Sequence, residues 1–270
     1  MEPKKENELR ILFIGDIVSY LGRKAVKECV PKLKKEYDVD LVVANCENTT
    51  GGRGISIDHY WQLVESGIDA FTSGEHIYRN PSILDEIENL DIAVPLNLYP
   101  SLLGKRFVSV KDKRGQEVIF VSLLGKVFMD PYVYNPFFSI QNFVEEHNNK
   151  TIIVDFHAEA TSEKRAMGFF LQGKVAGVLG THTHIPTADE QILGGKTAYI
   201  TDVGMTGSKN SVIGVKKEII LKRFTTGEKE RFEWEREGDY LLNAVIISID
   251  TKGQMAKNIC RVNILCGGKE

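Results

Sequence analysis

Short apolar runs that end in polar residues recur along the first third of the chain and predict buried strands. These runs are Leu9–Ile14, Leu41–Ala44 and Asp69–Thr72. They are mostly apolar throughout, as in parallel strands that are covered on both faces. Between them, apolar residues three to four positions apart predict an amphipathic helix over Arg23–Tyr37, which Pro31 is expected to kink or divide. A second helix is expected over Ile57–Ser66. The repeated order of strand, polar turn and helix favours an α/β sheet.

The rest of the chain combines further buried runs with alternating segments. The buried runs are Ile152–Asp155, Val175–Leu179 and Ala198–Thr201. Alternation predicts a hairpin of Phe107–Lys111 with Glu117–Leu123. It also predicts an antiparallel closing sheet over Lys229–Trp234, Tyr240–Ile249 and Met255–Ile264. The aromatic and proline-rich residues 128–138 are expected to form an ordered surface loop.

No linker or repeat divides the chain, so we predict one domain over residues 1–270. Residues 1–8 are interpreted as a polar N-terminal extension, and residues 105–150 as an insertion that holds the hairpin and the aromatic loop.

Composition and charge exclude several classes of protein. The 34 Lys and Arg residues nearly balance the 37 Asp and Glu residues, for a formal charge of −3, so no broad basic surface indicates a stable nucleic-acid or membrane partner. The four cysteines are widely spread and fit no zinc or disulfide pattern, so we expect thiols in a reducing compartment. The N-terminus is polar and no apolar run is long enough to cross a bilayer. These features favour a cytoplasmic location.

Residues of the kinds that bind metals follow six of the buried strands. In chain order they are Asp16, Glu47 with Asn48, Glu75 with His76, His157, His182 with His184, and Asp202. Because open α/β sheets bind ligands at the carboxyl ends of their strands, we expect these side chains to converge. Their mixed oxygen and nitrogen donors suit iron, manganese or zinc. The sequence therefore predicts a metal centre at one edge of the sheet.

The histidines strengthen this prediction, because four of the six belong to these strand ends. His182 and His184 are two residues apart, a spacing that points both imidazoles to the same side of an extended segment. Such a pair can serve two adjacent metals. The same spacing occurs in amidohydrolases, so a zinc amidohydrolase is an alternative. His59 and His147 lie outside these clusters and receive no functional role.

Six long stretches keep one order along nearly all of the chain. They are ILFIGDIV (11–18), LVVANCENTTGGRGIS (41–56), GIDAFTSGEH (67–76), VDFHAEATSEKRAMG (154–168), GTHTHIPTAD (180–189) and YITDVGMTG (199–207). Together they resemble the YmdB-like bacterial metallophosphoesterases, a branch of the calcineurin-like binuclear phosphoesterase superfamily. The resemblance implies a four-layer α/β/β/α sandwich with mixed sheets, and hydrolysis of phosphodiesters such as 2′,3′-cyclic nucleotides. It also implies two divalent or trivalent metal ions, with iron expected first and manganese or zinc as alternatives.

The resemblance assigns roles to individual residues. The positions that match ligands of the first metal are Asp16, Glu47, Asn48 and His184. The positions that match ligands of the second are Glu47, which bridges, with Glu75, His157 and His182. His76 matches the catalytic histidine that protonates the leaving oxygen. Beside these ligands, Asp155 and Asp202 are candidates to orient an imidazole from behind, while Arg53 and Lys164 are interpreted as solvated surface charges.

One position departs from the family pattern, which has Gly-Asn-His where this chain has Gly74-Glu75-His76. Glu75 brings a negative charge and one more methylene to a place where the family has a neutral ligand. Its carboxylate either coordinates the metal as a third anionic ligand or displaces it. We therefore predict a binuclear phosphodiesterase that acts on a small phosphodiester. The alternative is a metal-containing binding or regulatory protein with impaired catalysis, and a homo-oligomer is left open.

Overall fold

The structure is a computed structural model that describes residues 3–99, 103–129 and 132–267. Its first sheet has seven strands in the order β11-β14-β1-β2-β3-β4, with β15 paired to β14. The strands are β1 (Glu8–Ile14), β2 (Leu41–Asn45), β3 (Ala70–Thr72), β4 (Ile92–Ala93), β11 (Gly207–Ser208), β14 (Tyr240–Asp250) and β15 (Met255–Cys266). Strands β1 to β4 are parallel, whereas β14 is antiparallel to β1. The sheet is therefore mixed.

The second sheet has six strands in the order β5-β6-β7-β8-β10-β9. Its strands are β5 (Val108–Lys111), β6 (Glu117–Leu124), β7 (Thr151–His157), β8 (Gly177–Thr181), β9 (Gln191–Leu193) and β10 (Thr197–Ile200). The central four are parallel, and the two edge strands are antiparallel to their neighbours. The predicted hairpin is confirmed as β5 and β6. Residues 105–150 supply these two strands and the helix that covers them, α3 (Pro136–Glu146).

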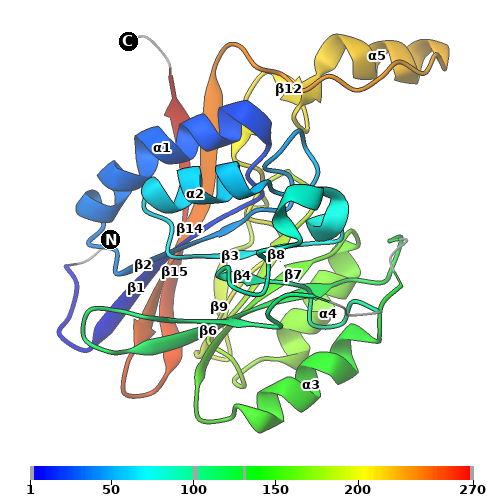
Figure 1. Ribbon diagram of the computed structural model, residues 1–270. Helices are drawn as coiled ribbons and strands as arrows, with labels where there is room; N and C mark the ends of the chain where they lie inside the picture. Colours follow the sequence, from blue (N-terminus) through cyan, green and yellow to red (C-terminus); the bar gives the residue numbers. More distant parts are fainter. Residues whose placement is uncertain (1–2, 100–102, 130–131, 268–270) are drawn as a thin grey trace.

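Helices cover the outer face of each sheet (Figure 1). The first sheet carries α1 (Ser19–Glu36) and α2 (Ile57–Glu65), and the second carries α3 and α4 (Thr161–Phe170). Short 3₁₀ turns, η1 (Ile77–Arg79) and η2 (Pro81–Ile83), follow β3. Alternate residues of β1 face opposite ways, as a strand requires: Leu12 and Ile14 pack under the helices, whereas Ile11 and Phe13 pack against the second sheet. The predicted four-layer α/β/β/α sandwich is thus confirmed.

An arm projects from this body beyond α1 (Figure 1). It contains the hairpin of β12 (Ser211–Val212) and β13 (Val215–Lys216) and the helix α5 (Lys217–Thr226), which ends at Gly227 with a positive φ of 77°. The predicted strand over Lys229–Trp234 is wrong. Residues 228–233 are exposed on the returning segment of the arm, and only Trp234 forms a β-bridge, to Val215. Among the described residues, this segment meets only the two-residue strand β13, which is too short to extend it into a strand. The other two strands of the closing sheet are confirmed as β14 and β15.

Two further predictions differ from the structure, one for α1 and one for the aromatic loop before α3. α1 begins at Ser19 and runs through Pro31 undivided. Pro31 and Lys27 lie on the exposed face of the helix, so water can satisfy the carbonyl that proline leaves unbonded. The predicted aromatic loop is too long, because α3 begins at Pro136, where the Asn135 side chain accepts the Phe137 N–H at 2.9 Å. Residues 130–131 of that loop lie outside the described residues.

The expectation of four free thiols is wrong for one pair. Cys29 of α1 and Cys266 at the end of β15 form a disulfide, whereas Cys46 and Cys260 are free. The pair is 237 residues apart, and only the packing of β15 beside α1 brings the two together. Among the described residues, no helix is both long and apolar enough to cross a membrane.

Candidate metal centre

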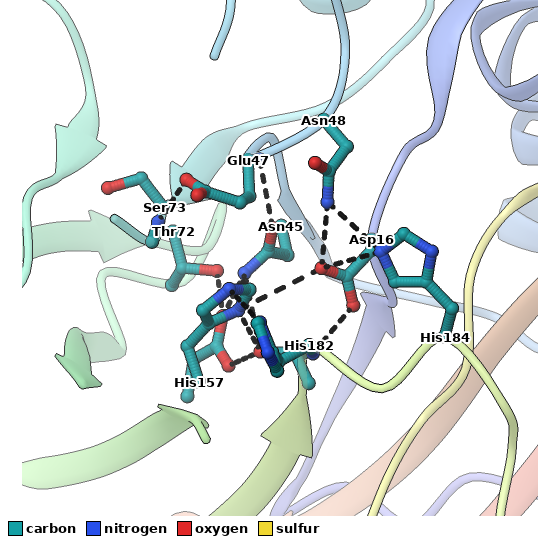
Figure 2. A network of polar contacts seen from close by, with 12 residues as sticks. Asp16, Asn45, Glu47, Asn48, Thr72, Ser73, His157, His182 and His184 are labelled. Carbon is teal, nitrogen blue, oxygen red and sulfur yellow. Dashed lines mark hydrogen bonds and ion pairs between the residues drawn. The ribbon is translucent and has the colours of Figure 1, made fainter. Parts of the chain in front are cut away.

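The carboxyl ends of strands from both sheets meet at one edge of the sandwich, where the predicted ligands gather (Figure 2). A buried hydrogen bond joins the sheets here, because Asn45 Nδ2 at the end of β2 donates to Asp155 Oδ2 of β7 at 2.8 Å. Asp16, two residues beyond β1, has its Oδ1 3.8 Å from His157 Nδ1 at the end of β7. The convergence predicted from the strand ends is therefore present in the fold.

A first cluster contains Asp16, Asn48 and His184. Asp16 is completely buried, and its Oδ1 lies 3.4 Å from Asn48 Nδ2 and 3.9 Å from His184 Nε2. The other ring nitrogen of His184, Nδ1, lies 3.1 Å from the carbonyl of Ile213, in the hairpin of the arm. Since a carbonyl only accepts, Nδ1 carries the proton, and the lone pair of Nε2 accepts from Asn48 Nδ2 at 3.1 Å.

A second cluster contains Glu75, His157 and His182, whose ligand atoms lie within 4.8 Å of one another. Glu75 Oε2 is 3.1 Å from His157 Nε2, and Glu75 Oε1 is 3.7 Å from His182 Nδ1. The two imidazoles meet at 3.2 Å between His157 Nε2 and His182 Nδ1. Glu75 Oε2 is buried without a hydrogen bond of regular geometry. Three side chains whose metal-ligating atoms face one another this closely fit a shared cation.

Asp155 orients His157, although it does so through Thr181. The Thr181 hydroxyl donates to Asp155 Oδ1 at 2.6 Å and lies 2.8 Å from His157 Nδ1. Because that hydroxyl donates its proton to Asp155, it accepts from His157 Nδ1, and His157 Nε2 is the ring nitrogen that faces the cluster. Burial raises the pKa of Asp155 to about 6, against the opposing effects of His157 and three hydrogen-bond donors.

Glu47 holds the loop that carries Glu75 and His76. Its Oε2 accepts the N–H of Gly74 at 2.6 Å, and its Oε1 accepts the N–H of His76 at 2.5 Å. Oε1 also lies 3.1 Å from His76 Nδ1. Glu47 is 1% exposed, and it forms a second group of possible metal donors with Glu75 and His76.

The charges of this site favour a bound cation. Burial lowers the pKa of His157, but Glu75, Asp16 and Glu47 outweigh it and raise that pKa to about 10. Burial also raises the pKa of Glu75, but the charge of His157 outweighs it, so the pKa of Glu75 is lowered. In the metal-free chain the carboxylates thus hold a proton on His157, at a place where a metal ion would supply the same positive charge.

His76 lies between the carboxylates of Glu47 and Glu75. Its ring is partly exposed, and Nε2 lies 3.9 Å from Glu75 Oε1. Burial lowers the pKa of His76, but the contact with the Glu47 carboxylate outweighs it, so the pKa lies above its usual value. A raised pKa favours the protonated ring, and a protonated histidine can donate to a leaving oxygen.

Lys164 is not the solvated charge predicted from the sequence. It is 1% exposed, and its Nζ donates to Asp202 Oδ2 at 2.6 Å and to the Thr181 carbonyl at 2.7 Å. Asp202 also accepts the N–H and hydroxyl of Thr183. It therefore holds the backbone between His182 and His184 rather than an imidazole. Both histidines have positive φ, 96° and 67°, so this loop needs such support.

Several residues of the site lacked a signal in the sequence. Glu159, two residues after His157, has its Oε2 3.1 Å from His182 Nε2. Asn45 and Thr181 act through hydrogen bonds that only the fold creates. Arg53 is exposed, as predicted, and His147 stacks on Phe143 away from the site.

Comparison with known proteins shows the family of the chain. A family model described as "YmdB-like protein" matches residues 12–262. The chain belongs to the YmdB-like family. It is 42% identical over 259 residues to the 2′,3′-cyclic-nucleotide 2′-phosphodiesterase of Bacillus subtilis (strain 168), a match that covers 95% of this chain and 97% of that protein.

Other YmdB-like relatives agree with this result. The chain is 37% identical to a putative phosphatase/phosphodiesterase of Mycoplasma genitalium, over 96% of this chain and 94% of that one. The crystal structure of a phosphatase from Mycoplasma pneumoniae superposes with a TM-score of 0.90 at 34% identity, covering 96% of this chain and 94% of that chain. A hypothetical protein from Thermus thermophilus superposes with a TM-score of 0.87 at 36% identity, covering 95% of this chain and 99% of that chain.

Proposed function

We propose that this chain is a metal-dependent phosphodiesterase that hydrolyses 2′,3′-cyclic nucleotides with the help of two metal ions. The observation that carries the proposal is the pair of donor clusters at one sheet edge, one around Asp16 and one around Glu75, linked by the 3.8 Å approach of Asp16 to His157. The substrate class follows the name of the Bacillus subtilis relative, which is similar over nearly the whole chain.

The residues that would hold the metals divide between the two clusters. Asp16, Asn48 and His184 would hold the first ion. Glu75, His157 and His182 would hold the second, and Glu47 would bridge. The mixed oxygen and nitrogen donors suit iron, with manganese and zinc as alternatives. When bound, two such ions neutralise phosphate charge and activate water at neutral pH for in-line displacement.

The remaining chemistry falls to His76. Water adds to phosphorus and gives up one proton, the bond from phosphorus to the 2′ oxygen breaks, and the proton of His76 goes to that leaving oxygen; the proton from the water balances the one that His76 loses. Glu47 fixes the ring through its contact with Nδ1 at 3.1 Å, which leaves Nε2 free for the substrate. The expected partner is thus a small phosphodiester, and the cytoplasmic location and oligomeric state stay predictions.

The alternative is a metal-containing regulatory protein in which Glu75 has impaired catalysis. The contacts of Glu75 favour the enzyme, because its oxygens lie 3.1 and 3.7 Å from two imidazole nitrogens, as a ligand's would.

The deciding experiment loads the purified, metal-stripped chain with iron, manganese or zinc. Turnover of 2′,3′-cAMP and of bis-p-nitrophenyl phosphate is then measured, with His76→Ala as the inactive control for the cyclic nucleotide. The proposal requires two bound ions and cleavage of the cyclic nucleotide. Bound metal without turnover of either compound would overturn it in favour of the regulatory protein.

A further inference from the structure

Each of the three histidines in the two clusters has one ring nitrogen held from outside the cluster. His157 Nδ1 meets the Thr181 hydroxyl at 2.8 Å, and His184 Nδ1 meets the Ile213 carbonyl at 3.1 Å. His182 differs, because its outer nitrogen, Nε2, meets a carboxylate, Glu159 Oε2, at 3.1 Å. Neutral groups therefore hold the rings of His157 and His184, whereas a charged group holds the ring of His182.

Of the three histidine side chains, that of His182 is also the least constrained by its surroundings. Its side chain is 25% exposed, compared with 1% for His157 and 9% for His184. Its backbone has a φ of 96°, a conformation that non-glycine residues rarely adopt. Its inner nitrogen, Nδ1, faces His157 at 3.2 Å and Glu75 at 3.7 Å. Rotation of this ring about χ2 would turn Nδ1 away from the cluster.

We propose that Glu159 is a positioning residue that fixes the ring and tautomer of His182. With the proton held on Nε2 by the Glu159 carboxylate, Nδ1 presents its lone pair to the second cluster. The negative charge of Glu159 also raises the basicity of the imidazole. His182 is therefore a stronger metal ligand than it would be beside a neutral hydrogen-bond acceptor. This inference rests on the proposed function, since it concerns the residues that would hold the second metal.

Glu159 is suited to a clean test because its side chain is 47% exposed and lies in the loop after β7. Replacing it should leave the fold intact, which thermal unfolding of the metal-free chain verifies. Glu159→Ala removes the support. Glu159→Gln keeps the length of the side chain and one acceptor oxygen, and it removes the charge. Glu218→Ala, on the exposed arm helix α5, is the matched control for loss of a surface carboxylate.

The experiment titrates each metal-free variant with Mn²⁺ by calorimetry, and then records kcat and KM for the loaded proteins. Loss of an outer-shell partner typically costs 10–100-fold in metal affinity, so we expect Glu159→Ala to weaken one of the two Mn²⁺ sites by about that factor. Glu159→Gln should recover most of the affinity, and Glu218→Ala should match the wild type. The kcat of Glu159→Ala should fall at limiting Mn²⁺ and recover as Mn²⁺ rises, with KM little changed.

Three results would overturn the inference. Wild-type affinity in Glu159→Ala would show that the contact positions nothing. Equal losses in the Gln and Ala variants would make Glu159 a direct ligand. A change confined to KM would make it a substrate contact. If the wild type binds two Mn²⁺ ions and hydrolyses nothing, the proposed function fails, while the ranking of the affinities still decides the role of Glu159.

Discussion

A β-carbon on Gly74 would lie 2.6 Å from Nε2 of His157 and 2.7 Å from Cδ of Glu47. No side chain fits there without moving one of these two residues. Gly74 also donates its N–H to Glu47 at 2.6 Å, so moving its backbone away would break this hydrogen bond. The glycine thus lets the loop after β3 lie directly against the donors of the second cluster.

We expect Gly74→Ala to displace His157 or Glu47 and to lower metal content and kcat/KM by at least about tenfold, the factor that 1.4 kcal/mol of lost binding energy gives. Overpacking of this kind costs about 1–3 kcal/mol of stability. Metal analysis and steady-state kinetics measure the effect. Gly253→Ala is the control, since its nearest neighbour would lie at an ordinary 3.5 Å. Full metal content and activity in Gly74→Ala would contradict the geometry described above.

Glu75 is the position where this chain leaves the family pattern, and its contacts predict the outcome of restoring asparagine. Glu75→Asn removes a charge and shortens the side chain, so it should weaken the second metal site by about tenfold. Glu75→Gln keeps the reach and loses only the charge, which separates the two effects. Calorimetric Mn²⁺ titration and 2′,3′-cAMP hydrolysis provide the readout. A large gain of activity in Glu75→Asn would show instead that the carboxylate impairs this chain.

The parts of the site that the sequence predicted are those whose signal is local. Asp16, His157 and His182 each follow a short apolar run, and parallel strands bring such positions to one edge. The hydrophobic pattern therefore predicted these strands and the convergence of the ligands, whereas the four-layer sandwich was implied by the family resemblance.

The parts that the sequence did not predict depend on tertiary packing. Lys164 resembles any helical lysine until α4 packs over β8 and its Nζ meets Asp202. Cys29 and Cys266 are separated by 237 residues, and their pairing requires the closing strand to lie beside α1. The Lys229–Trp234 segment shows the opposite error, because its alternation meets only the two-residue strand β13 and forms an isolated bridge there.

Metal binding should release a proton at neutral pH. Burial lowers the pKa of His157, but Glu75 and its neighbouring carboxylates outweigh it and raise that pKa to about 10, so His157 is protonated in the metal-free chain at pH 7. A metal ligand must be deprotonated, so Mn²⁺ affinity should rise about tenfold per pH unit below that pKa. Calorimetry in buffers of different ionisation enthalpy counts the protons released. A binding enthalpy that is independent of the buffer would contradict this expectation.

His76 should matter most for substrates with poor leaving groups. General acid catalysis contributes about 10²–10⁴-fold, so His76→Ala should lose about that factor on 2′,3′-cAMP. The loss should be far smaller on bis-p-nitrophenyl phosphate, whose nitrophenolate leaves without a proton. Because the pKa of His76 is raised, the acid form persists above the usual range, and wild-type activity should fall on the alkaline side as this proton is lost. His59→Ala, outside the site, is the control; equal losses on both substrates would argue against the role of an acid.

The buried pair of Lys164 and Asp202 should be essential for the loop that carries His182 and His184. Lys164→Met leaves the Asp202 carboxylate buried without its cation, and breaking such a pair costs about 3–5 kcal/mol. Lys222→Met, which breaks an exposed ion pair with Glu230 on the arm, should change stability little. Urea unfolding of the metal-free variants measures both. Because Asp202 accepts the N–H of Thr183, Lys164→Met should also weaken metal binding at temperatures where the fold persists. Unchanged stability together with unchanged metal affinity would refute the support that we assign to this pair.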